Sequence, residues 1–157
     1  MAEVRENTTK EEGSYRTSED RVSRRDSDGR LSPFSRTTAK EIDVRGGKVT
    51  TVETYSLDLP GLARDGKLHL SERSRTIQKI DKTEQEVEQL DPGDPNAGLK
   101  VMKKTTDIVV SGASGTQETK TSEARNTNGG FTVVSVEKRK SNQVAATQGQ
   151  TRGETPK

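Results

Sequence analysis

The amino-acid sequence predicts an all-β protein built from tandem two-strand repeats of about 32 residues. Threonine, whose branched side chain favours extended backbone, is abundant along the chain. Glycine follows Asp or Asn at several points where a hairpin needs a turn, and apolar residues return at nearly constant intervals. Together these observations predict an extended β-meander, ribbon or solenoid.

The repeat is clearest in the residues that follow each turn. An apolar residue, here called the anchor, comes directly after a short glycine-bearing segment. The anchors are Leu31, Leu68, Leu99 and Phe131, and they are separated by 37, 31 and 32 residues. A further echo links VE…LDLPG at 52–61 with VE…LDPG at 87–93. We therefore expect each unit to carry a similar pair of strands.

Apolar pairs at the last three anchors are the candidate core and assembly residues. They are Leu68, Leu70, Leu99, Val101, Phe131 and Val133. The glycines expected to hold the turns are Gly29, Gly66, Gly98 and Gly129. Glycine suits these positions because tight hairpin turns require positive φ.

The domain organisation follows from the repeat. The expected units are a polar N-terminal half-repeat or tail at 1–28, repeats at 29–65, 66–98 and 99–129, and a half-repeat with a mobile C-terminal tail at 130–157. The polar ends, residues 1–12 and 142–157, are expected to be mobile in the isolated chain.

Strand assignments rest on the alternation of apolar and polar residues. In Lys48–Leu59, a period of two places Val49 and Tyr55 on one face. Residues 82–90 could form a short helix, but they align with a segment whose pattern is that of a strand. We therefore expect a strand there as well.

The composition leaves little material for a core. Leu, Ile, Val and Phe account for 27 of 157 residues, which is below the level typical of compact domains. Burial on this scale offsets the entropy of ordering poorly, so strand pairing between subunits is expected to complete the fold. The alternative is an intrinsically disordered interaction segment that folds on binding or is regulated by modification.

Catalytic chemistry is not predicted. The chain has no cysteine and one histidine, His69, which alternation places opposite the flanking leucines. A general base needs an oriented partner, and the sequence offers none near it. We therefore expect no enzyme activity and no small-molecule substrate.

Calcium is the one cofactor for which the sequence offers weak candidates; otherwise no cofactor is expected. Asp, Asn and Gly cluster in two turns, where oxygen ligands could surround a cation. The candidate ligands are Asp26, Asp28, Asp91, Asp94 and Asn96. Neither turn has the full calcium-loop spacing, and the same residues form ordinary β-turns without metal. The turn is the favoured interpretation.

Charge and hydropathy bear on the partners. A net charge of +2 and few aromatic residues do not favour nucleic acid, and no apolar run reaches the length of a membrane span. The expected partner is therefore a further copy of the chain, in a homo-oligomer or filament.

The predicted function is that of a non-catalytic, self-assembling subunit of a filament or surface fibre. A fibre would favour an extracellular or cell-surface location, although the first 30 residues contain no apolar run typical of a signal peptide.

Overall fold

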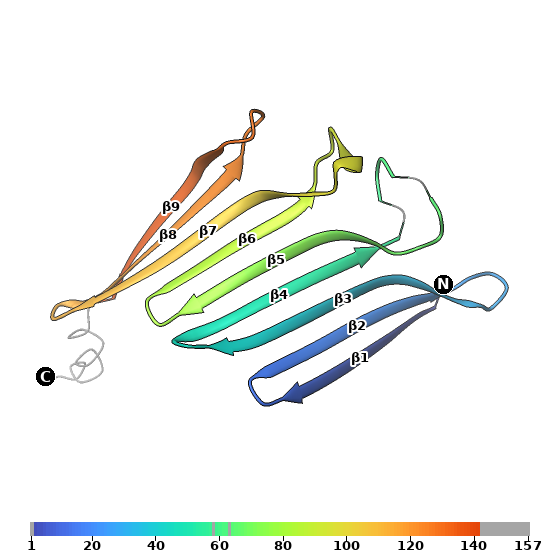
Figure 1. Ribbon diagram of the computed structural model, residues 1–157, viewed down its shortest axis with the longest axis horizontal. Helices are drawn as coiled ribbons and strands as arrows, with labels where there is room; N and C mark the ends of the chain where they lie inside the picture. Colours follow the sequence, from blue (N-terminus) through green and yellow to red (C-terminus); the bar gives the residue numbers. More distant parts are fainter. Residues whose placement is uncertain (1, 58, 63, 142–157) are drawn as a thin grey trace, which may run out of the picture.

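A computed structural model describes residues 2–57, 59–62 and 64–141. Nine antiparallel strands form one sheet in which every strand pairs with its neighbours in the sequence (Figure 1). The strands are β1 (Glu3–Glu12), β2 (Tyr15–Arg25), β3 (Leu31–Val44), β4 (Gly47–Ser56), β5 (His69–Lys79), β6 (Lys82–Leu90), β7 (Leu99–Gly112), β8 (Gly115–Arg125) and β9 (Phe131–Ser141). One short 3₁₀ helix, η1 (Pro95–Ala97), lies between β6 and β7.

The predicted all-β class is confirmed, and the architecture is the meander among the predicted alternatives. Over the residues that the structure describes, the sheet is open, because β1 and β9 each have only one neighbouring strand. Figure 1 shows a single layer, and within the described residues no side chain is fully buried. Backbone hydrogen bonds and cross-strand side-chain pairs therefore hold the sheet together in place of a core.

Two-residue turns close the hairpins at one end of the sheet. These turns follow β1, β3, β5 and β7. In the second of them Gly46 has φ +80°, a conformation that suits glycine. Its neighbour Gly47 begins β4 so close to β5 that a Cβ would overlap the backbone oxygen of Gln78. We call this end the tight-turn end.

Longer loops lie at the opposite end, here called the loop end. In each loop an Asp or Asn side chain accepts backbone N–H groups. Asp26 Oδ1 accepts from Asp28 and Arg30 at 2.9 Å, Asp65 Oδ1 from Lys67 at 3.0 Å, Asp91 Oδ1 from Gly93 at 2.9 Å, and Asn126 Oδ1 from Gly130 at 2.9 Å. The predicted turn glycines Gly29, Gly66, Gly98 and Gly129 all lie in these loops and all have positive φ.

The anchors lie where odd-numbered strands begin. Leu31, Leu99 and Phe131 are the first residues of β3, β7 and β9, and Leu68 directly precedes β5. A β-bulge, in which one extra residue is inserted into a strand, follows each anchor after three positions. The extra residues are Phe34, Ser71, Met102 and Val134. The same irregularity thus recurs in four successive odd-numbered strands.

Two local expectations can be compared with the strands. Residues 82–90 form β6, as the alignment indicated. Residues 3–12, expected to be mobile, instead form β1, because this polar segment needs only one partner strand and the tight turn at Gly13 supplies it. The predicted C-terminal tail at 142–157 lies outside the described residues.

Candidate assembly surfaces

The two faces of the sheet differ in composition. Directly opposed residues of neighbouring strands share a face, and residues alternate between faces along each strand. One face, here called the apolar face, is assigned these apolar residues by the pairing: Val4, Tyr15, Leu31, Ile42, Val44, Val49, Tyr55, Leu70, Ile77, Leu90, Leu99, Val101, Ile108, Val110, Phe131, Val133 and Val136. The opposite, polar face carries Val22, Ala39, Val52, Val87, Val109 and Ala124 as its apolar side chains.

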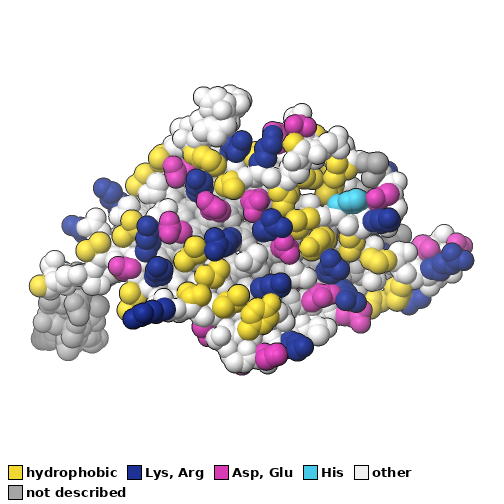
Figure 2. Space-filling model, in the orientation of Figure 1, with side chains coloured by type: hydrophobic (Ala, Val, Ile, Leu, Met, Phe, Trp, Pro, Cys, Tyr) yellow, Lys and Arg dark blue, Asp and Glu magenta, His cyan; other side chains and the backbone are white. Residues whose placement is uncertain are grey.

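The most continuous apolar row crosses β2 to β5. Tyr15 lies opposite Ile42, Ile42 opposite Val49, and Val49 opposite Ile77. Tyr15 and Ile42 are still 37% and 38% exposed. Figure 2 shows apolar side chains in small groups separated by charged ones. A second protein layer could therefore bury more of this row.

Charged residues cross the apolar face between its apolar groups. Arg73 Nε lies 2.9 Å from Glu53 Oε2, and Arg73 Nη1 lies 3.7 Å from Glu88 Oε2. Since these three residues sit on successive strands β4 to β6, they connect neighbouring strands as well as keeping the face soluble.

Apart from Leu68, which precedes β5 and has no paired residue in the sheet, the sequence-predicted anchor residues share this face but come from separate hairpins. Leu70 lies opposite Tyr55, Leu99 opposite Leu90, Val101 opposite Glu88, Phe131 opposite Arg125, and Val133 opposite Glu123. Leu68, before β5, lines a pocket with Pro33 of the apolar face and Val22 of the polar face. The other five residues form a discontinuous apolar surface at the loop end.

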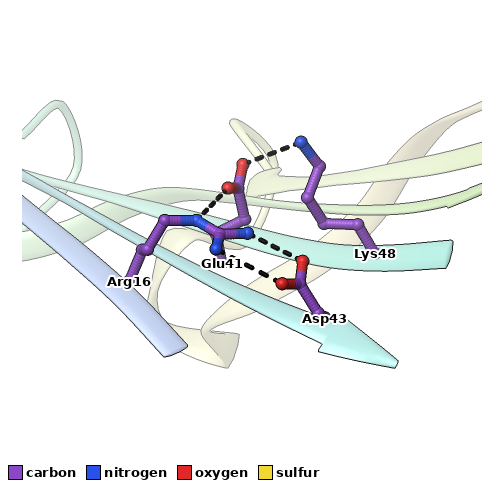
Figure 3. Close-up of polar contacts among 4 residues, drawn as sticks. All are labelled: Arg16, Glu41, Asp43 and Lys48. Atoms are coloured by element: carbon purple, nitrogen blue, oxygen red, sulfur yellow. Dashed lines mark hydrogen bonds and ion pairs between the residues drawn. The ribbon is translucent and has the colours of Figure 1, made fainter. Parts of the chain in front are cut away.

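The polar face carries an ion-pair cluster that the sequence did not reveal (Figure 3). Arg16 on β2 donates to Glu41 at 2.7 Å and to Asp43 at 2.7 and 3.3 Å, both on β3. Lys48 Nζ on β4 lies 3.2 Å from Glu41 Oε2. The hydrogen bonds from Arg16 lower the pKa of both carboxyl groups, and the contact with Lys48 lowers that of Glu41 further. The cluster joins three strands by solvent-exposed charges.

The two edge strands present different surfaces. On β9, Val133, Val134 and Val136 are 52%, 60% and 53% exposed, and the basic run Lys138 to Lys140 follows them. On β1 every residue except Val4 is exposed, and the strand consists mainly of uncharged polar residues and of charged residues of both signs. Each edge also has one row of backbone groups unpaired within the sheet, which is the feature that recruits further strands.

His69 has a partner that the sequence analysis missed. Its Nε2 lies 2.8 Å from Asp65 Oδ1, four residues earlier in the β4–β5 loop. The hydrogen bond from His69 lowers the pKa of Asp65, and the N–H of Lys67 adds to the effect. The Asp65-Gly66 sequence could have indicated a turn in which the Asp65 carboxylate accepts a backbone N–H group. It could not have indicated that the same carboxylate contacts the imidazole ring of His69. Both side chains are more than a third exposed, and the pair closes the loop.

The calcium candidates lie in two separate loops. Asp26 and Asp28 belong to the β2–β3 loop, whereas Asp91, Asp94 and Asn96 belong to the β6–β7 loop. Asp26 Oδ1 accepts two backbone N–H groups, and Asp91 Oδ2 lies 3.2 Å from Lys100 Nζ. Over residues 2–57, 59–62 and 64–141, no three His, Cys, Asp or Glu side chains are grouped as a metal site requires. The side chains of Asp26 and Asp91 instead accept hydrogen bonds that stabilise the two turns.

The part of the chain that the structure describes contains no helix with the length and apolar character needed to cross a bilayer. The sequence matches no known protein family and no curated protein. The fold is similar to that in a crystal structure of a protein of unknown function from Bacteroides fragilis. That similarity has a TM-score of 0.55 at 13% sequence identity and covers 87% of this chain and 91% of the other. At this identity the similarity concerns the fold alone.

Proposed function

We propose that this chain is a non-catalytic structural protein that assembles with further copies of itself through its open sheet. The observation that carries the proposal is the β9 edge. It combines a row of backbone hydrogen-bonding groups that is unpaired within the described sheet with three valines that are more than half exposed. Long, apolar edge strands are the usual sites at which sheets add strands from another chain.

The apolar face supports the same proposal. A sheet with one apolar face is normally stabilised by a second layer, and no described segment of this chain supplies one. A further copy can supply burial at this face and backbone pairing at an edge. Folding and assembly would then be coupled by mass action, which suits a filament or surface fibre.

The recurrent bulges support a repeating unit of about 32 residues. The extra residues at 34, 71, 102 and 134 follow the anchors at a constant offset, so their spacing is also 37, 31 and 32 residues. We infer that the unit is a hairpin with its bulge. Such a unit buries its surface only against its neighbours, as in other repeat proteins.

Electron microscopy of the full chain over a concentration series tests the proposal. Wild-type protein should form uniform filaments above a threshold concentration. Val136→Lys should raise that threshold at least about tenfold, or about 1.4 kcal/mol, because it places a charge on the open edge. Thr121→Lys is the matched control, since Thr121 lies directly opposite Val136 on the same face but in the interior strand β8.

The control separates edge pairing from face packing. If Thr121→Lys raises the threshold as much as Val136→Lys, the edge is not the assembly surface. If the wild-type chain stays monomeric and folded at all concentrations, the proposed function is refuted.

The second candidate is an interaction segment that orders on binding a partner. Its supporting observation is the lack of a fully buried side chain within the described residues. It predicts poorly dispersed amide NMR signals for the isolated chain at every concentration. Well-dispersed signals from a dilute, monomeric sample would eliminate it.

A further inference from the structure

We infer that β1 is a self-complementary edge, which pairs antiparallel with β1 of a second copy about a two-fold axis at Thr8. The inference rests on the proposed self-assembly and adds a specific interface to it. Its basis is the charge pattern of β1 together with the direction of its free backbone groups. An axis perpendicular to the sheet keeps the apolar faces of both copies on the same side.

The backbone of β1 fixes which residues can bond outward. The carbonyl of Ala2 accepts the N–H of Arg25 on β2. Since hydrogen bonding alternates along an antiparallel strand, even-numbered residues of β1 face β2 and odd-numbered residues point their N–H and C=O groups outward. Thr8 therefore lies at a non-hydrogen-bonded position of the new interface, and Asn7 and Thr9 of the two copies bond across it.

Pairing about Thr8 makes every charge on the edge complementary or neutral. Each Arg5 lies opposite Glu11 of the other copy, and each Glu6 lies opposite Lys10. The two-fold axis doubles both pairs, which gives four cross-strand pairs of opposite charge. Such pairs stabilise antiparallel strands, whereas like charges in direct opposition destabilise them.

Neighbouring registers are much less favourable. A shift of one position would pair each residue with one whose side chain lies on the opposite face of its own sheet. Directly paired residues must share a face, and the two-fold axis keeps equivalent faces on the same side, so this register is excluded. A shift of two places Glu3 opposite Glu11, and a shift of two in the other direction places Glu6 opposite Glu12. Because each clash is also doubled by symmetry, the charge pattern selects the register centred on Thr8.

The charged groups are accessible for this pairing. Among the described residues, Glu6, Lys10 and Glu11 have no ion-pair partner within 4.0 Å. Arg5 has only a contact of 3.4 Å with Glu3 on its own strand, and its side chain is 75% exposed. A second copy can therefore pair with these groups without breaking a cross-strand ion pair.

A single introduced cysteine tests the register, because the natural chain has none. At the axis the two Cα atoms of residue 8 would be about 4.5 Å apart, within disulfide range. Thr8→Cys should therefore form a covalent dimer under mild oxidation, with a yield at least ten times that of Glu12→Cys. In the control, the two copies of residue 12 would be eight positions apart along the strands, or about 27 Å.

Charge exchange tests the pairs themselves, and sedimentation is the readout. The Val136→Lys background keeps the other edge from contributing, and circular dichroism checks that each variant is folded. In this background the chain should be a dimer, and Lys10→Glu or Glu6→Lys alone should weaken dimerisation at least tenfold. Combining both substitutions in one chain, or mixing the two single variants, should restore it.

The outcomes separate this inference from the proposed function. Filaments from the wild-type chain, with equal disulfide yields for Thr8→Cys and Glu12→Cys, would overturn the β1 interface and leave self-assembly standing. Failure of the folded double variant to recover dimers would overturn it as well. If the wild-type chain does not assemble and the Thr8→Cys variant does not form the disulfide dimer, both the proposed function and the β1 interface are refuted.

Discussion

The apolar row across β2 to β5 should stabilise the sheet although it is open to solvent. Ile77→Ala tests this, because Ile77 is half-buried beside Val49. The substitution removes three carbon groups, worth about 2.4 kcal/mol at full burial at about 0.8 kcal/mol each. Partial exposure reduces the expected loss to about 1.5 kcal/mol. For a chain of this length, that corresponds to a fall in Tm of about 3–6 °C.

Ile80→Ala is the matched control for this prediction. Ile80 lies three residues further on, in the β5–β6 turn, and is 96% exposed. The same chemical change there should alter the free energy of unfolding by less than about 0.5 kcal/mol. Urea titrations at low protein concentration, followed by far-ultraviolet circular dichroism, measure both variants. Equal losses for the two variants would refute the reasoning, because burial in the row would then contribute nothing.

A double-mutant cycle locates the effect in the cross-strand pair. If Val49 and Ile77 stabilise each other directly, the combined Val49→Ala and Ile77→Ala variant should lose less than the sum of the single changes. The expected coupling is about 0.2–1 kcal/mol. Additivity within error would mean that each side chain acts through other neighbours.

Two further predictions concern a turn and a charge cluster. Gly47→Ala should destabilise the sheet by about 1–3 kcal/mol through overlap with the backbone of β5, whereas Gly112→Ala, which meets nothing within 4 Å, should be nearly neutral in the same urea titration. Arg16 lowers the pKa of Glu41 in the folded state, so this contribution to stability is present above about pH 4 and lost as the pH falls through the lowered pKa. Arg16→Gln should therefore raise the pKa of Glu41 in an NMR titration and flatten the acid limb of the stability curve, and an unchanged pKa would contradict the assignment.

The sequence was informative about features that lie within one strand or turn. Alternation placed Val49 and Tyr55 on one face, and the turn glycines marked where the chain reverses. These features depend on residues close in sequence, so local patterns carry them. The same reasoning gave the all-β class without any knowledge of strand order.

Features that depend on the pairing of two strands were not accessible in this way. The extra residues of the four bulges are Phe34, Ser71, Met102 and Val134; three are apolar and one is polar, so no single residue type marks the position. Only their partners across the sheet make them irregular. The cluster at Arg16 likewise joins residues 25 and 27 positions apart, and its existence depends on the register of β2 and β3. Charge pairing could be proposed from composition, but not assigned to residues.

The strict neighbour order of the strands has a consequence for folding kinetics. Residues paired across the described sheet are at most 32 positions apart, as Gly47 and Lys79 are. Loop closure is therefore inexpensive for every hairpin, and such short-range topology favours faster folding than is usual for β proteins. During synthesis each new strand can join the previous one as soon as it emerges. The newest strand is then an exposed edge only until the next strand pairs with it, and β9 is the strand whose outer edge stays unpaired within the described sheet.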